Sequence, residues 1–311
     1  MTTVPAMGAA LSNWGRWGGD DELGCVNFIT EETRRAAASL VKQGKVFSLA
    51  LPLNRNGPQP PAARRLNPQH VMLQTGTDLR AGVQRGAIDG WGYSDDMVTM
   101  ALQCGTHWDA LAHAFHDYKM YNGRDCTLVG VDGAAKNDIS VLSDAVVGRA
   151  VLCDIARARG VDALEADHRI TVADLEQTLS SQAVEVRLGD VLLVRTGHLG
   201  RIRASSSWDR LTYSDEPGMG LETMPWVHEH GIAAVAADNW ALEVLPSGTE
   251  IMLPVHAVAI VYMGLLLGEL FALDELAVDC ERDGVFEMLL VAQPLPFTGA
   301  VGSPVNPIAL K

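Results

Sequence analysis

Apolar residues occur along this chain in short runs that polar and glycine-rich segments separate. Several runs are almost uninterrupted, which is typical of strands that a sheet buries on both faces. We expect strands at Val46–Leu53, Val98–Leu102, Ala150–Cys153, Val191–Thr196, Ile232–Ala237, Leu265–Leu270 and Val285–Ala292.

Helix signals lie between several of these runs. Thr30 and Thr171 are typical N-caps, and acidic residues follow each within the first helical turn. Pro254 suits the start of a further helix. We expect helices from Thr30 to about Gln43, over Val172–Ser180, around Leu221–His230 and from Pro254 to near Gly264. The alternation of strands and helices predicts one mixed α/β domain over residues 1–311.

The N-terminal arm, about residues 1–29, does not fit a regular helix because it is dense in glycine and tryptophan. Trp14 and Trp17 could wall a pocket of this subunit or of a partner, or they could anchor the arm to the body. The proline-rich stretch Asn54–Asn67 predicts a loop. From there to Asp96 the mixed, glycine-rich sequence assigns no element.

Composition narrows the classes of function. The chain has 24 Lys+Arg and 38 Asp+Glu, a net charge of −14, which disfavours binding to nucleic acids and anionic membranes. The uncharged run Ala257–Leu267 is shorter than the ~20 residues that span a bilayer. The 5 cysteines are scattered without a Cys-x-x-Cys pair, which predicts reduced thiols and a cytoplasmic protein.

The stretch Gln103–His113 carries the densest candidate chemistry, with the sequence QCGTHWDALAH. His107 and Asp109 are two residues apart, so an extended backbone points both side chains to one face. Gln103 joins that face if the strand reaches it. Imidazole and carboxylate groups together suit zinc, manganese or iron, so one interpretation of the stretch is part of a metal site. The alternative is a hydrogen-bonded or surface histidine, because a His-x-Asp pair also arises by chance.

Two polar residues of the second half lie in apolar surroundings. His256 follows the start of an apolar helix, and Glu269 lies within a strand-like apolar run. A buried carboxylate needs a cation or strong hydrogen-bond donors, so an ion pair with an arginine such as Arg195 is one explanation. Grouped with His107 and Asp109, the two residues would instead complete a two-metal site.

These motifs, taken in order, resemble the bacterial cyclase-like metal-dependent hydrolases, which include kynurenine formamidases and isatin hydrolases. The family signature is HxGTHxDxPxH, and residues 103–113 agree with it at every fixed position except two. His256 and Glu269 resemble the later ligands of that family. Gly189–Gly197 resembles one of its strands, and Pro294–Pro304 resembles its C-terminal segment. Two departures stand out: Gln103 replaces the first metal-binding histidine, and Leu111 replaces the proline.

The resemblance implies a single mixed α/β domain of the cyclase/kynurenine formamidase type, a swivelling β/β/α-like fold. It implies one or two divalent ions per chain, Zn²⁺ or Mn²⁺, and a homodimer or homotetramer. The metal ligands that it implies are Gln103, His107, Asp109, His256 and Glu269. His113 is the candidate for proton transfer, because imidazole titrates near neutral pH.

We therefore expect a metal-dependent hydrolase that cleaves an amide or ester bond by metal-activated water. The expected substrate is small: a cyclic amide, imide or lactone, or an aryl formamide. Candidate pocket walls are Trp14, Trp17, Trp108 and Trp240, although core packing is the alternative for each of them. Two other classes stay open: a metal-dependent lyase, dehydratase or isomerase, and a non-catalytic metal- or ligand-binding protein, which Gln103 in place of the histidine leaves open.

Overall fold

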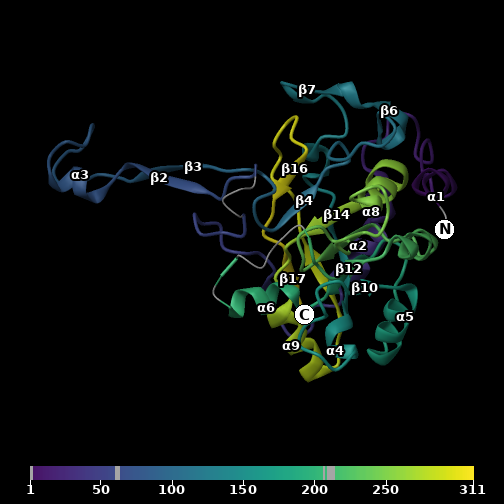
Figure 1. Ribbon diagram of the computed structural model, residues 1–311. Coiled ribbons are helices and arrows are strands. Elements are labelled where there is room, and N and C mark those ends of the chain that lie inside the picture. Colours follow the sequence, from purple (N-terminus) through teal and green to yellow (C-terminus); the bar gives the residue numbers. More distant parts are fainter. Residues whose placement is uncertain (1–2, 60–63, 206, 209–213) are drawn as a thin grey trace.

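The computed structural model describes residues 3–59, 64–205, 207–208 and 214–311. Among these residues a mixed sheet of 9 strands forms the centre of the molecule, in the order β1-β17-β15-β9-β11-β13-β14-β4-β16 (Figure 1). Its strands are β1 (Val46–Ser48), β4 (His107–Asp109), β9 (Val147–Asp154), β11 (Val191–Arg195), β13 (Ala234–Ala237), β14 (Leu266–Glu269), β15 (Glu287–Val291), β16 (Gly302–Pro304) and β17 (Ile308–Leu310).

Helices cover this sheet, and shorter strand pairs lie around it. The α-helices are α1 (Val4–Ala10), α2 (Glu31–Ala38), α3 (Gly76–Arg80), α4 (Ile155–Ala158), α5 (Val172–Ser181), α6 (His198–Ala204), α7 (Met224–Glu229), α8 (Pro254–His256) and α9 (Asp274–Asp283). A π-helix, η6 (Ala257–Met263), continues α8. The short strands are β2 (Gln69–Gln74), β3 (Asp95–Thr99), β5 (Lys119–Met120), β6 (Arg124–Asp125), β7 (Val129–Gly130), β8 (Gly133–Ala134), β10 (Arg169–Ile170) and β12 (Gly218–Met219).

The apolar runs of the sequence form the parallel centre of the sheet. Strands β9, β11, β13 and β14 are parallel and buried along their length, because apolar layers cover both faces. On β11, Leu192 packs into a cluster with α5, α7 and η6, whereas Leu193 packs into a second cluster with α9. Alternate residues of each strand therefore belong to two hydrophobic cores, one on each face of the sheet.

Most of the expected elements are present with shifted ends. Helix α5 covers the expected range and Thr171 caps it, and the helix from Pro254 ends before Gly264 as a π-helix. Helix α2 ends at Ala38 rather than near Gln43. The expected strand Val98–Leu102 is wrong, because β3 ends at Thr99 and turns fill the chain up to β4. Strand pairing, which sequence periodicity does not reveal, decides where a strand ends.

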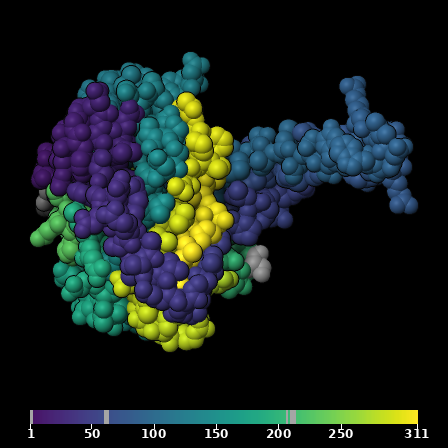
Figure 2. All heavy atoms as spheres, turned by 180° about the vertical axis from the view of Figure 1, so that it is seen from behind, coloured from purple at the N-terminus to yellow at the C-terminus, as the bar shows by residue number. Residues whose placement is uncertain are grey.

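Residues 66–101 form an arm that projects from the body, and we call it the hairpin arm (Figures 1 and 2). Its shaft is the antiparallel pair β2 and β3, and α3 lies near its far end. The bond from Ala101 N–H to the Leu66 carbonyl closes its root at 3.3 Å. The sequence assigned no element to most of this segment. Part of the preceding loop, expected over Asn54–Asn67, lies outside the described residues.

Within the part of the chain that is described, no helix has the length and apolar character needed to cross a membrane.

Candidate metal site

Strand β4 places two of the expected ligands side by side. His107 and Asp109 point to one face, as their spacing predicts, and both are fully buried. Between them, Trp108 points to the opposite face and packs on Phe271, with ring centroids 5.0 Å apart. Thr106 fixes the start of β4, since its hydroxyl donates to the Leu270 carbonyl at 2.6 Å.

Strand β14 brings the third ligand from the other half of the chain. It pairs antiparallel with β4, in the register that sets Glu269 opposite His107. Directly opposed residues share a face of the sheet, so the Glu269 side chain joins the two from β4. The next residue, Leu270, has a φ of +57°, which is an uncommon backbone conformation for a branched residue beside a site.

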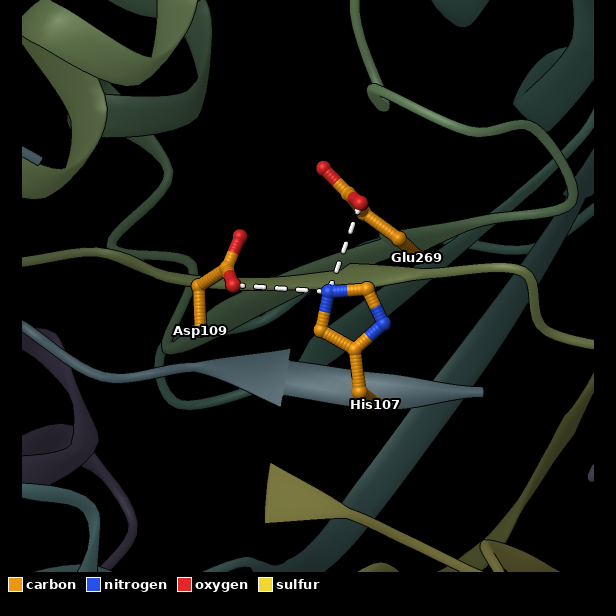
Figure 3. Close-up of side chains that lie close together, drawn as sticks. All are labelled: His107, Asp109 and Glu269. Carbon is orange, nitrogen blue, oxygen red and sulfur yellow. Dashed lines mark ion pairs between the residues drawn. The ribbon is translucent and has the colours of Figure 1, made fainter. Parts of the chain in front are cut away.

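The three side chains point toward one another (Figure 3). Nε2 of His107 lies 3.4 Å from Oδ1 of Asp109 and 3.3 Å from Oε2 of Glu269. One donor atom from each residue fits within a distance of 4.8 Å. Nε2 of His107 and both Asp109 oxygens have no hydrogen-bond partner among the described residues, although all are buried. Unpartnered buried acceptors that converge in this way are suited to holding a cation.

The fourth expected ligand enters from α8. Nε2 of His256 lies 3.2 Å from Oε1 of Glu269 and 3.7 Å from Oδ2 of Asp109. Its other ring nitrogen, Nδ1, lies 2.6 Å from Oε1 of Glu243. The sequence analysis missed Glu243, because nothing in the local pattern distinguishes an acidic residue that orients a ligand from one on the surface. A carboxylate behind a histidine fixes the ring for metal binding through Nε2.

Burial and neighbouring charges shift the pKa values of His107, His256 and Asp109. Burial opposes the positive charge on His107, but Asp109 and Glu269 outweigh it and raise the pKa of His107 to about 9. Burial likewise opposes the charge on His256, yet hydrogen bonds to the acidic neighbours raise its pKa well above the usual value. Burial raises the pKa of Asp109, but the surrounding histidines lower it further and leave it well below the usual range. Burial and the Asp109 charge raise the pKa of Glu269, but hydrogen bonds to His107 and His256 leave it lowered overall. Asp109 and Glu269 are therefore charged, and without a cation the two imidazoles hold protons to balance them.

His113 lies at the edge of the cluster. Its Nε2 is 3.6 Å from Oδ1 of Asp109, and its Nδ1 is buried without a hydrogen-bond partner among the described residues. Burial lowers the pKa of His113 despite the Asp109 charge. Burial therefore favours the neutral form of the ring at neutral pH.

Gln103 lies in a turn, not on the strand that was expected to carry it. Its side-chain amide packs on Gly302, where an added Cβ would meet Gln103 Nε2 at 2.5 Å. Gly302 is paired with Asp109 across β16 and β4, so that Cβ would point to the same face as the Asp109 side chain. Gln103 therefore fills space beside Asp109.

Arg65 is a second residue that the sequence analysis missed. Its Nη1 lies 4.0 Å from Oε2 of Glu269 and donates to the Gln103 carbonyl at 3.4 Å. The residue precedes the hairpin arm in a proline-rich loop, where an arginine carries no signal of its own. Its guanidinium adds a positive charge at the edge of the cluster.

The four candidate tryptophans have separate environments. Trp108 fills the core, which is the alternative that the sequence left open for each of them, and Trp240 is almost fully buried with Leu245 and Leu270. Trp14 stacks on Tyr262 at 5.4 Å, and Trp17 meets Phe28 edge-on at 5.1 Å. Trp14 thus anchors the N-terminal arm to η6, whereas Trp17 packs on Phe28 within the arm and, with it, against the core cluster of the body.

The donor set fits a divalent ion. Imidazole nitrogen from His107 and His256 and carboxylate oxygen from Asp109 and Glu269 are ligands that zinc and manganese both accept. Nδ1 of His107 lies 2.7 Å from the Gly105 carbonyl, so each histidine has a partner behind it and Nε2 directed into the cluster.

Comparisons with known proteins find similar proteins over most of the chain. A family model described as "Putative cyclase" matches residues 47–244. A solved structure described as a novel cyclase is 41% identical, with a TM-score of 0.87 and coverage of 96% of this chain and 99% of that chain. Isatin hydrolase A from Ralstonia solanacearum is 18% identical, with a TM-score of 0.65 and coverage of 91% and 98%. Isatin hydrolase A from Labrenzia aggregata is 17% identical, with a TM-score of 0.62 and coverage of 88% and 94%. No curated protein matches the chain.

Proposed function

The chain belongs to the cyclase family, and from that premise we propose that it is a metal-dependent hydrolase of a small cyclic amide, imide, lactone or aryl formamide. The observation that carries the proposal is the convergence of donor atoms from His107, Asp109, Glu269 and His256 in one buried place. Two solved structures with the same fold are named isatin hydrolase A. Because isatin is a cyclic amide, their name supports a small cyclic amide as the substrate class.

His107, Asp109, His256 and Glu269 would hold a divalent ion, which when bound would lower the pKa of water towards neutral and polarise a carbonyl group. His113 then moves the proton. Its Nε2 lies 3.6 Å from Oδ1 of Asp109, so the neutral ring is placed to accept a proton from the attacking water and to donate it to the leaving nitrogen or oxygen. One water is consumed, the bond from the carbonyl carbon to nitrogen or oxygen breaks, and a carboxylate forms.

Arg65 suits that product. Ring opening of a cyclic amide or lactone creates a negative charge where the substrate had none, and Arg65 places a guanidinium beside Glu269. Arginine binds carboxylates through paired hydrogen bonds, so we assign Arg65 to orienting the group that becomes the carboxylate.

The test is a metal-loaded assay with product mass as the readout. Tag-free protein purified without chelator is analysed for bound metal, reconstituted with Zn²⁺ or Mn²⁺, and incubated with isatin, glutarimide, a γ-lactone and formanilide. Hydrolysis adds the mass of one water to a cyclic substrate. His113→Asn should keep the metal and lower kcat by roughly 10²–10⁴-fold. His230→Asn, which changes a histidine bonded to the Trp226 carbonyl on α7, is the matched control.

Two outcomes would contradict the proposal. A product with the mass of its substrate, or one that has lost water, would favour the isomerase, lyase or dehydratase class. Stoichiometric metal without turnover of any cyclic amide, imide, lactone or formamide would favour a binding protein that has lost the activity.

A further inference from the structure

A second group of buried polar atoms without partners involves none of the candidate metal ligands. Nε2 of His198, Oε1 of Glu216 and Oδ1 of Asn239 are buried, and none has a hydrogen-bond partner among the residues that the structure describes. Nε2 of His198 lies 3.8 Å from Oε1 of Glu216, which is too far for a direct hydrogen bond. Buried polar atoms are costly unless a water molecule or a ligand pairs with them.

These residues lie at the same edge of the sheet as Glu269. His198 follows β11, Asn239 follows β13, and Glu269 ends β14. The three strands are parallel neighbours, so their carboxyl ends meet at one edge, where open α/β sheets bind ligands. Neighbouring strands are ~4.8 Å apart, so roughly 10 Å separates β11 from β14. A small ring with a polar group at each end, and a hydrogen bond at the far one, spans this distance.

Hydrogen bonds tie Glu216 to the strand end that carries Glu269. Oε2 of Glu216 accepts the backbone N–H of Trp240 at 2.7 Å. The carbonyl of Asn239, the preceding residue, accepts the N–H of Leu270 at 3.0 Å. Leu270 directly follows Glu269 in the chain. The carboxyl group of Glu216 is therefore held beside the candidate metal site.

Arg201 decides which ring nitrogen of His198 carries the hydrogen. Nη2 of Arg201 lies 3.0 Å from Nδ1 of His198. A guanidinium group only donates, so Nδ1 accepts and Nε2 carries the hydrogen. His256 is the opposite case, because its Nδ1 faces the carboxylate of Glu243 and its Nε2 is left for a metal ion. His198 is therefore a hydrogen-bond donor at Nε2 rather than a metal ligand.

The buried carboxyl group of Glu216 supplies a second donor. Within the described part of the chain, its sole candidate ion pair is with His198, and that pair would need a proton on Nδ1, where Arg201 already donates. A buried carboxylate without a cation is costly, so Glu216 keeps its proton. Burial raises the pKa of Glu216, and the Glu269 charge adds to this effect. Because Oε2 accepts from Trp240, the proton is on Oε1.

Two donors that converge in this way match a carbonyl oxygen. Nε2 of His198 and Oε1 of Glu216 are 3.8 Å apart, so one oxygen at ~2.8 Å from each accepts both hydrogen bonds. Oδ1 of Asn239 adds an acceptor, because its Nδ2 donates to the Pro217 carbonyl at 2.7 Å. A cyclic imide offers the complementary groups, since its N–H lies between two carbonyl groups and only one of them is hydrolysed.

We propose that His198 and Glu216 hydrogen-bond the carbonyl oxygen that is not attacked, so that the enzyme selects cyclic imides over simple lactams and lactones. The proposal rests on the hydrolase activity proposed above and chooses one class among the substrates named there. A lactam or lactone leaves both donors unpaired in a buried place, and sites that hydrogen-bond one group of a substrate strongly reject analogues that lack it.

The binding of two rings that differ by one oxygen tests the proposal. Glutarimide and δ-valerolactam have the same ring size, and only glutarimide has the second carbonyl group. Calorimetry with zinc-loaded protein measures both Kd values, and every protein carries His113→Asn to suppress turnover. Three variants are made in this background: His198→Phe, Glu216→Gln and Glu216→Leu. The control is His230→Phe, at a histidine bonded to the Trp226 carbonyl on α7. Zinc content and circular dichroism verify that each variant is folded.

We expect the background protein to bind glutarimide at least ~10-fold more tightly than δ-valerolactam. His198→Phe and Glu216→Leu should abolish this preference, because each removes a donor. Glu216→Gln should keep it, since the amide nitrogen donates while the amide oxygen accepts the N–H of Trp240. The control should keep it as well.

Three outcomes would overturn the proposal. They are equal affinity of the background protein for the two rings, as expected if the buried atoms hold a water molecule only, an equal loss of both rings in His198→Phe, and a lost preference in Glu216→Gln. If His198→Phe or Glu216→Leu does not fold, the background protein and Glu216→Gln still decide. A preference that depends on these side chains without hydrolysis of either ring would refute the proposed activity alone. Hydrolysis of both rings without a preference in binding would refute the role of His198 and Glu216 alone.

Discussion

Oε1 of Glu243 lies 2.6 Å from Nδ1 of His256 and also accepts the backbone N–H of that residue at 3.0 Å. The second oxygen of Glu243 accepts the N–H of Val255 at 2.9 Å. One carboxylate thus holds both the ring and the start of the helix that carries it. Nε2 is left to face Asp109 and Glu269.

Replacing Glu243 with glutamine should weaken metal binding by roughly 10–100-fold, because the amide keeps the shape but loses the charge that supports the ring. Competition with a chromophoric chelator measures the affinity. The control is Glu222→Gln, which removes a half-exposed carboxylate 3.6 Å from Arg169. Equal affinities for Glu243→Gln and the wild type would show that Glu243 does not support a metal ligand.

Metal affinity should rise with pH. The pKa of His107 is about 9 without a cation, so at pH 7 a metal ion must displace a proton from Nε2. Protons compete with the ion, and affinity should rise about tenfold per pH unit for each proton released below that pKa. Calorimetry in buffers of different ionisation enthalpy counts the protons. Binding without proton release at pH 7 would contradict this charge balance.

Substitution of Gln103 should change metal binding through its place beside Asp109. Gln103→His should tighten binding, since imidazole is a stronger zinc ligand than an amide oxygen. Gly302→Ala should displace the Gln103 side chain and act like Gln103→Ala, because the new methyl group would overlap the amide. Titrations of the three variants decide this. If Gln103→His, Gln103→Ala and Gly302→Ala all bound the metal ion as tightly as the wild type, Gln103 would lie outside the site.

Thiol chemistry should single out one cysteine. Cys25, Cys104, Cys153 and Cys280 are buried, whereas Cys126 is partly exposed. Burial raises the pKa of Cys25 to about 12 and of Cys104 to about 11, so their thiolates are scarce. An aromatic disulfide reagent should modify one thiol rapidly in the native protein and all 5 after denaturation. Cys126→Ser should remove the fast reaction, and a fast phase that persists would refute this assignment.

The sequence by itself determined the local features of the structure, which depend on residues close together along the chain. Residues that are two apart on a strand face the same way whatever the rest of the chain does, so the spacing of His107 and Asp109 was sufficient to predict that they share a face. The N-cap at Thr171 and the apolar run that forms β11 likewise depend only on neighbouring residues, and the sequence predicted both. The apolar surroundings of His256 and Glu269 singled them out as candidate ligands, and the family resemblance supported that choice.

Only the tertiary structure decided which distant residues meet. Glu269 reaches His107 through strand register, and Glu243 reaches His256 through the docking of a loop on a helix. Arg65 reaches the cluster from a loop with no regular pattern. Such contacts depend on the path of the whole chain, because residues far apart in sequence leave no shared period. The hairpin arm eluded the sequence for a related reason: its apolar residues point outward, so no alternation with a buried face marks its strands.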